Sequence, residues 1–217
     1  MNIIYLLFHG LSPYSGISKK ILHQVKGFEA CGHRVSLCTY SIADNGHRVR
    51  MINNEIIEDY GTGKPAAAKR RVSYQCIYRY AVTHQVELIY VRSFHNANPF
   101  TIRLFSKLRK AGIKIAMEIP TYPYDSEYAG FPLVTRLGIQ VDKVFRKTLA
   151  KHVNAIVTFS DYHCIFGQRT IQISNGVDFD SIPLKKTVSK NTSVIHLLGV
   201  AEVHYWHGYD RLIEGLG

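Results

Sequence analysis

The sequence lacks long hydrophobic runs. No stretch of about 18 consecutive apolar residues occurs, the length that a membrane-spanning helix needs. The first residues, MNIIYLLFHG, have neither the basic start nor the small-residue cleavage site of a signal peptide, so we interpret them as a first strand. We therefore expect a soluble or peripheral protein.

Cysteines and acidic residues are also scarce. The four cysteines, Cys31, Cys38, Cys76 and Cys164, show no Cys-x-x-Cys or metal-ligand spacing, and we expect reduced thiols in a cytoplasmic protein. Only 16 Asp plus Glu stand against 27 Lys plus Arg, which gives a net charge of +11. Such a surface favours anionic partners: phosphorylated ligands, nucleic acid or an anionic membrane face.

Apolar segments alternate with amphipathic ones along most of the chain. The expected strands are residues 3–8, 34–40, 86–93, 113–120, 154–160 and 170–178. The expected helices are residues 15–30, 67–84, 98–112 and 133–152. This alternation predicts an α/β fold with a doubly wound, mostly parallel sheet. The pattern is weaker over 41–66, where Asn45-Gly46 indicates a turn, and we expect a short helix or turn at 161–167.

The character of the sequence changes near Pro183. Residues 183–193 are polar, basic and without periodicity, which is typical of an interdomain linker. We predict a first domain over 1–182 and the start of a second over 194–217, opening with a strand at 194–198.

The predicted helix 133–152 is amphipathic. Its expected apolar face consists of Val134, Leu137, Val141, Val144 and Phe145. Its other face carries Arg136, Lys143, Arg146, Lys147 and Lys151. We interpret this basic face either as a membrane-docking surface or as an ordinary solvated face.

Ligands of open α/β sheets bind beyond the carboxyl ends of the strands, so we searched the loops there. Ser15-Gly16 begins a helix whose free N–H groups favour an anion, although the loop is not Gly-x-Gly-x-x-Gly and could be an ordinary capped turn. Arg92 follows a strand and could clamp a phosphate or carboxylate, or be solvated or salt-bridged. Near Glu118, hydroxyls and aromatic rings suit a sugar, or the loop is merely ordered by proline.

Two motifs near the end resemble those of retaining glycosyltransferases of family 4, which have the GT-B fold. ISNGVDFDSI, residues 173–182, is similar to the turn that closes their first domain, and Asn175, Gly176, Val177 and Asp178 match. HLLGVAEVHYWHGYDRLIEGLG, residues 196–217, resembles the start of their second domain, and Gly199, Gly208, Asp210, Leu212 and Ile213 match. Ala201 and His207 stand where the family has the arginine and lysine that hold the donor diphosphate.

The resemblance implies an enzyme with two Rossmann-like domains facing a cleft. It would move a sugar, with retention, from a nucleotide sugar to a saccharide or lipid-linked acceptor in surface polysaccharide or glycolipid synthesis. Neither a cofactor nor a metal is expected. The chain lacks the Glu-x7-Glu motif of the second domain, so we expect an acceptor-side fragment that is inactive alone. Its expected location is the cytoplasm, with peripheral binding to the inner membrane face.

The resemblance also implies site residues by position. The donor side would include Ser15, Gly16, Ile17, Asn175 and His207. The acceptor side would include Arg92, Glu118, Thr121, Tyr122 and Ser160. Glu118 is the candidate for a catalytic role, at a strand end where family members often carry a histidine.

Two other classes of protein remain open. A nucleic-acid-binding α/β module accounts for the charge but not for the Asn-Gly-Val-Asp turn. A stand-alone nucleotide-binding sensor would need residues 194–198 to join the first sheet.

Overall fold

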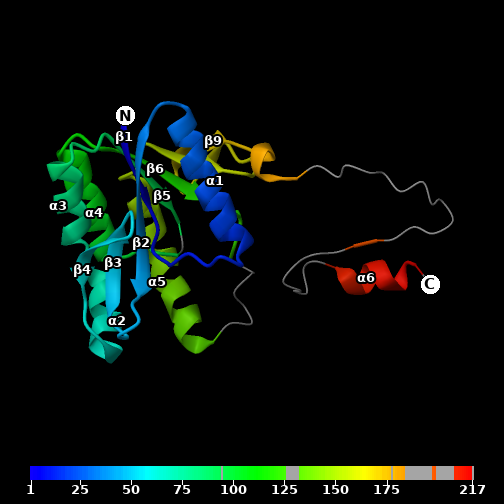
Figure 1. The fold of residues 1–217 in the computed structure, drawn as a ribbon, viewed down its shortest axis with the longest axis horizontal. Coiled ribbons are helices and arrows are strands. Elements are labelled where there is room, and N and C mark those ends of the chain that lie inside the picture. The colour runs from blue at the N-terminus through cyan, green and yellow to red at the C-terminus, as the bar shows by residue number, and fades with distance from the viewer. Residues whose placement is uncertain (94, 126–131, 177, 184–196, 199–207, 217) are drawn as a thin grey trace. The chain divides into compact units, whose positions relative to one another are not determined.

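The computed structural model describes residues 1–93, 95–125, 132–176, 178–183, 197–198 and 208–216 (Figure 1). The chain divides into two compact units, Met1–Asp178 and Phe179–Gly217. The second contains a short 3-10 helix, Phe179–Ser181, and helix α6, Tyr209–Glu214. The expected linker and the strand at 194–198 lie mostly outside the described residues, so the domain boundaries stay predictions.

A nine-stranded sheet in the order β4-β3-β2-β1-β5-β6-β7-β9-β8 forms the centre of the first unit. Its parallel strands are β1 (Asn2–Leu6), β2 (Arg34–Ile42), β5 (Leu88–Arg92), β6 (Lys114–Ile119), β7 (Ala155–Thr158) and β9 (Gln168–Gln172). The antiparallel edge strands are β3 (Arg48–Ile52), β4 (Glu55–Asp59) and β8 (Cys164–Ile165). The predicted Rossmann-like α/β fold with a mostly parallel sheet is confirmed. The strand order reverses between β1 and β5, where such folds open a crevice.

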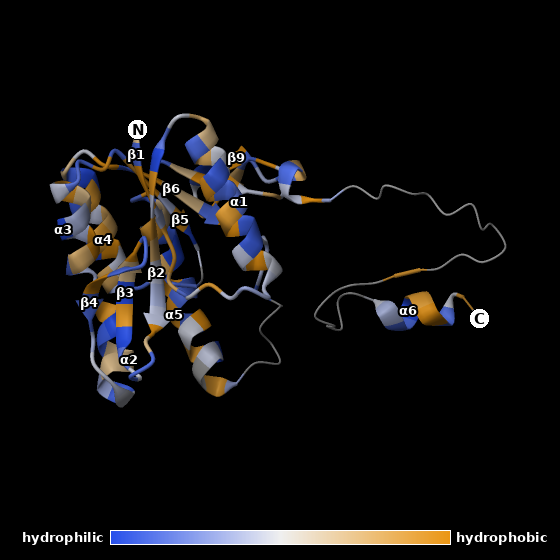
Figure 2. Ribbon diagram, viewed as in Figure 1, coloured by the Kyte–Doolittle hydropathy of each residue, from blue (hydrophilic) through white to orange (hydrophobic). Residues whose placement is uncertain are grey.

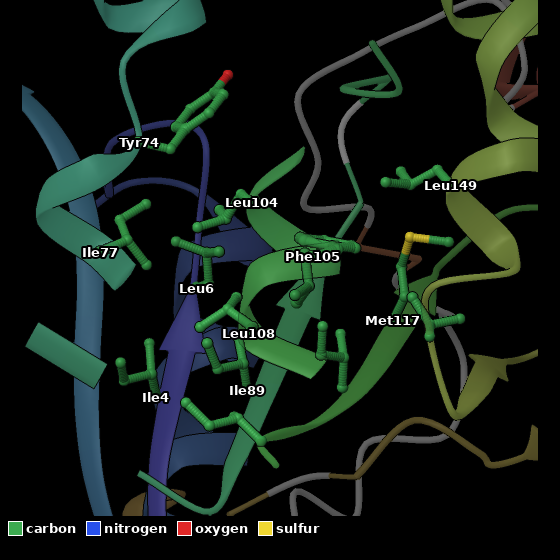
Figure 3. Close-up of a cluster of buried hydrophobic side chains, with 14 of the residues drawn as sticks. Ile4, Leu6, Tyr74, Ile77, Ile89, Leu104, Phe105, Leu108, Met117 and Leu149 are labelled. Atoms are coloured by element: carbon green, nitrogen blue, oxygen red, sulfur yellow. The ribbon is translucent and has the colours of Figure 1, made fainter. Parts of the chain in front are cut away.

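Helices cover both faces of the sheet. They are α1 (Gly16–Ala30), α2 (Gly63–Val72), α3 (Gln75–Thr83), α4 (Pro99–Lys110) and α5 (Leu133–Ala150). Alternate residues of β1 point to opposite faces, so Ile4 and Leu6 belong to the same core as Phe105 of α4 (Figure 3), whereas Tyr5 packs in the other core with Ile21 of α1. Helices α3, α4 and α5 contribute to the larger of these two cores, and α1 to the smaller.

One local prediction is wrong, and two hairpins were not expected from the sequence. Residues 48–59 form the β3–β4 hairpin, which turns at Asn53-Asn54 with φ values of 48° and 71°. The single helix expected over 67–84 is two helices, α2 and α3, and α2 ends before Ser73. Residues 164–172 form the β8–β9 hairpin, so the short helix or turn expected at 161–167 is a turn at Phe166-Gly167, with φ values of 53° and 81°. The turn predicted at Asn45-Gly46 is confirmed, because Gly46 has a φ of 78° and donates to the Ala43 carbonyl at 2.8 Å.

The apolar face expected on α5 is also wrong. Three of its five members, Leu137, Val141 and Val144, are exposed by 57%, 45% and 70%. The side chain of Val134 lies outside the described residues, and Phe145 is half-buried. The helix instead buries Ile139 and Asp142. Figure 2 shows hydrophobic residues along α5 as well as in the central strands.

The basic face of α5 is partly neutralised. Arg146 donates to both carboxylate oxygens of Asp125, at 2.7 and 3.1 Å, and Lys143 lies 3.4 Å from the same carboxylate. The exposed basic residues of the predicted face are Arg136, Lys147 and Lys151. Across the described part of the chain, no helix has the length and apolar character needed to cross a membrane.

Candidate functional site

A cavity of about 800 Å³ opens at the carboxyl ends of β1, β5 and β6. We call it the first cavity. Its lining comes from the loop after β1, the first turn of α1, the loops after β5 and β6, and Asn175-Gly176 beyond β9. This position is the crevice that the strand order predicts. Lys26 of α1 pairs with Asp178 at 2.7 Å, which holds the Asn175-Gly176 segment near α1.

The first turn of α1 presents polar groups to the first cavity. Ser15 is the N-cap and accepts a hydrogen bond from the backbone N–H of Ser18 at 3.4 Å. The Ser18 hydroxyl in turn accepts from the backbone N–H of Ser12 at 2.9 Å. The turn contains no acidic residue, and a Cβ added to Gly16 would meet no atom within 4 Å. The open helix N-terminus is therefore suited to an anionic or hydroxyl-rich ligand.

A buried ionic network supports the floor of the first cavity. Glu118 has no exposed surface, and Arg92, its cross-strand neighbour on β5, donates to its Oε1. The other oxygen, Oε2, accepts from the hydroxyl of Tyr90 at 2.6 Å and from the amide of Gln24 at 2.9 Å. Lys20 adds a cation 3.8 Å from the carboxylate. Both oxygens of Glu118 are thus occupied by protein donors.

The network fixes the protonation of its neighbours. Burial raises the pKa of Tyr90, and the charge of Glu118 raises it further, so the phenol stays a hydrogen-bond donor. Burial also lowers the pKa of Lys20, which the charge of Glu118 partly offsets. Lys20 additionally lies 3.5 Å from the ring centroid of Phe159, where the ring's π face attracts the cation.

Six of the residues predicted from the sequence line the first cavity together: Ser15, Gly16, Ile17, Arg92, Thr121 and Asn175. Glu118 lies in the network and is not among the lining residues. Tyr122 stacks edge-on against Tyr162 and Phe166, and Ser160 shares a 2.9 Å hydrogen bond with Thr158. His207 and Ala201 lie outside the described residues.

Sequence reasoning missed His9, His95 and Lys20, which also line the first cavity. The two histidines sit in loops after β1 and β5, and position alone could have selected them. Burial is the main cause that lowers the pKa of both, and the charge of Arg92 also lowers that of His9. Both rings are therefore neutral near pH 7, and a neutral imidazole has one donor and one acceptor nitrogen. In His9 the donor is Nδ1, which donates to the Gly10 carbonyl at 2.7 Å, so Nε2 is the acceptor.

Within the described ranges, no three His, Cys, Asp or Glu side chains come together in a way that could hold a metal ion. All four cysteines are free; Cys38 and Cys76 are buried, and Cys31 and Cys164 are exposed. No protein-family model, curated protein or solved structure matches the chain.

Proposed function

We propose that residues 1–178 form the acceptor-binding domain of a retaining glycosyltransferase that uses a nucleotide-sugar donor. The observation that carries this proposal joins the sequence motif to the cavity. Asn175 and Gly176, from the motif that resembles family 4, line the same cavity as the start of α1 and Arg92. Segments about 160 residues apart in sequence therefore contribute to one site, as that family arrangement requires.

The chemistry of the first cavity suits a saccharide acceptor. Hydroxyls of Ser12, Ser93 and Thr121, together with the neutral rings of His9 and His95, supply donors and acceptors for sugar hydroxyls. The helix N-terminus of α1 would lie on the donor side, where it favours the negative charge of phosphates. We propose a saccharide or lipid-linked acceptor in surface polysaccharide or glycolipid synthesis, with no metal or cofactor.

Glu118 is better suited to positioning than to catalysis. Its carboxylate is fully buried and accepts from Arg92, Tyr90 and Gln24, so no oxygen is left to take a proton from an acceptor hydroxyl. We therefore assign it the role of holding Arg92, which does line the cavity. The catalytic groups proper are expected from the second domain that the resemblance implies.

Peripheral binding to an anionic membrane is the localisation that we propose. Leu137, Val141 and Val144 form an exposed apolar stripe on α5. Arg136 and Lys147 are exposed cations on the same helix. An apolar stripe beside cations is the pattern of a helix that lies in a lipid interface.

Binding measurements on the chain test the proposed function. A panel of mono- and disaccharides is titrated by ligand-observed NMR, with UDP and GDP in parallel. We expect at least one saccharide to bind with a Kd in the millimolar range or tighter, and the nucleotides to bind more weakly than that saccharide. Tight binding of a nucleotide with no saccharide binding would instead support a nucleotide sensor.

A further inference from the structure

A second cavity, of about 640 Å³, lies beside the first, and the two share His9, Gly10 and His95 in their linings. We call it the arginine cavity. Arg50 of β3 lines it together with Arg70 and Arg71 from the last turn of α2. Arg48, two residues before Arg50 on the same face of β3, donates to the hydroxyl of Tyr40 at 2.7 Å, and Tyr40 also lines this cavity.

In the part of the chain that the structure describes, these four arginines have no acidic partner. Among the described residues, none of them lies within 4.0 Å of a carboxylate, whereas Arg79, Arg92 and Arg146 all do. The carboxylate that α5 brings to this region, Asp142, is engaged elsewhere: it accepts from the backbone N–H of Ala97 at 2.9 Å and from Tyr124 at 3.0 Å. Within the described ranges the cluster therefore has no carboxylate to balance its charge, although the ring of Tyr40 lies 4.2 Å from the Arg70 guanidinium carbon.

Arg50 is the most unusual member because it is only 1% exposed. A buried cation without an anionic partner is destabilising, so proteins rarely keep one without a use for it. Its neighbours are neutral at pH 7, because burial raises the pKa of Cys38 to about 12 and raises that of Tyr60 as well. The Nη1 of Arg50 donates to the Leu7 carbonyl at 2.7 Å, which fixes the guanidinium in place.

Unused hydrogen-bond donors gather at the same place. The Nε atoms of Arg48, Arg50 and Arg70 are buried and have no hydrogen-bond partner among the described residues. Such groups are uncommon in folded proteins. Burial is the main cause that lowers the pKa of Arg70, and the nearby charges of Arg71, Arg48 and Arg50 lower it further.

We propose that the arginine cavity binds a phosphate group carried by the acceptor whose sugar occupies the first cavity. Arginine forks match phosphate oxygens, and several cations around one cavity favour a multiply charged group over a single carboxylate. The shared wall of His9, Gly10 and His95 lets one ligand reach both cavities. The link to an acceptor rests on the proposed function, whereas the phosphate site itself does not.

Nucleic acid is the less suitable ligand for these cations. Arg50 is almost fully buried and Arg70 is half-buried, so both face a cavity and not an open surface along which a phosphate backbone could run. A small phosphorylated ligand can enter the arginine cavity, whereas a duplex or an extended strand needs an open basic surface to bind along.

Calorimetric titration of inorganic pyrophosphate at low ionic strength tests the phosphate site. The variant Arg70→Gln/Arg71→Gln should weaken pyrophosphate binding about tenfold or more, since charge-assisted hydrogen bonds are lost. The matched control is Lys64→Gln/Lys69→Gln, which removes the same charge from the same helix at exposed positions outside the cavity lining. The control should bind within about twofold of the parent chain, as exposed charges contribute little.

Two further binding measurements identify the source of the phosphate and separate this inference from the proposed function. Glucose 1-phosphate tests a soluble acceptor. For a lipid acceptor the measured quantity is the extra binding to phosphatidic acid vesicles over phosphatidylglycerol vesicles, because α5 should bind both. Glucose 1-phosphate binding, or that extra vesicle binding, should be lost in the Arg70→Gln/Arg71→Gln variant. Saccharide binding without pyrophosphate binding would overturn this inference alone. Pyrophosphate binding without saccharide binding would leave the phosphate site standing and overturn the acceptor function. Equal losses in both double variants, or tighter binding of single-stranded RNA than of pyrophosphate, would also overturn the inference.

Discussion

At the scale of single residues, Glu118 ties together three segments of the chain. It joins Arg92 and Tyr90 on β5 with Gln24 and Lys20 on α1. From the sequence we expected Glu118 and Arg92 at strand ends and left open that Arg92 is salt-bridged, but its partner could not be predicted. Their pairing follows from the parallel register of β5 and β6, a long-range feature that no local pattern encodes.

Replacing Glu118 by glutamine should destabilise the fold. The amide is nearly isosteric but leaves the buried Arg92 cation without its partner, and we expect a loss of about 3 kcal/mol in the free energy of unfolding. Urea denaturation measures it. In a double-mutant cycle, Glu118→Gln/Arg92→Met should cost less than the sum of the two single changes. An unchanged midpoint for Glu118→Gln would show that the network does not stabilise the domain.

Gly10 should tolerate no side chain. A Cβ there would lie 2.8 Å from the backbone oxygen of Tyr40 on β2, so Gly10→Ala must push the loop after β1 away from that strand. We expect a loss of roughly 1–3 kcal/mol on thermal or urea unfolding. The control is Gly16→Ala, where the new methyl group meets nothing within 4 Å and should stabilise by up to about 1 kcal/mol. Equal effects of the two changes would contradict the close approach.

His9 and His95 should make stability depend on pH. Their pKa values are lowered in the folded state by burial, so the unfolded chain binds more protons as the pH falls below about 6.5. Stability should therefore fall from about pH 6.5 downward and be unaffected by them above about pH 7.5. Nearby charges also act on the two rings. Arg92 lowers the pKa of His9. Arg146 lowers the pKa of His95, whereas Asp142 and Asp125 raise it.

The comparison that isolates these histidines is urea unfolding of the parent chain and of His9→Gln/His95→Gln between pH 5 and 8. The double variant should show a shallower loss of stability toward pH 5. Parallel curves for the two proteins would mean that neither ring is held neutral by the fold.

At the scale of elements, α5 shows where sequence reasoning succeeds and fails. Its bounds, predicted as 133–152 and observed as Leu133–Ala150, follow from helical periodicity. The buried side of α5 does not follow from periodicity, because it includes Asp142. The burial of Asp142 depends on hydrogen-bond donors from Ala97 and Tyr124, which are far away in sequence. The β3–β4 hairpin was missed for a similar reason: its turn at Asn53-Asn54 lacks the glycine that signals a tight turn.

The exposed stripe of α5 should bind anionic lipid. In cosedimentation with vesicles of phosphatidylglycerol, Leu137→Ser/Val144→Ser should reduce the bound fraction severalfold, since each apolar side chain contributes to burial in the interface. Stability should change little because both residues are exposed by more than half. The control, Leu22→Ser/Val82→Ser, changes two apolar residues that are each 47% exposed on α1 and α3. No binding at low salt, or equal losses in both variants, would reject α5 as the docking helix.

At the scale of the whole molecule, some basic side chains pair with carboxylates and others do not. Several carboxylates, among them Glu118, Asp125 and Asp178, are engaged by nearby basic side chains. The three arginines that line the arginine cavity, and Arg48 beside them, have no such partner among the described residues. The net charge of +11 predicted an anionic partner in general, and the fold indicates where a small anion would bind.

The fold class and six of the ten predicted site residues follow correctly from the sequence, because both depend on where strands end. Ser15, Gly16, Ile17, Arg92, Thr121 and Asn175 meet in one cavity for that reason. Tyr122 and Ser160 also follow strands, but their side chains contact Tyr162 and Thr158. The direction of a side chain in a loop depends on such neighbours, and position along the chain does not predict it.

The most direct test of the central claim measures saccharide binding when the first cavity is blocked. Thr121→Trp places a large side chain on an exposed part of the cavity lining, and Thr83→Trp makes the same change on an exposed turn of α3. We predict that the best saccharide ligand loses at least about tenfold in affinity with Thr121→Trp and keeps its affinity with Thr83→Trp. Unchanged binding to Thr121→Trp, or no saccharide binding to the parent chain, would contradict an acceptor site in the first cavity.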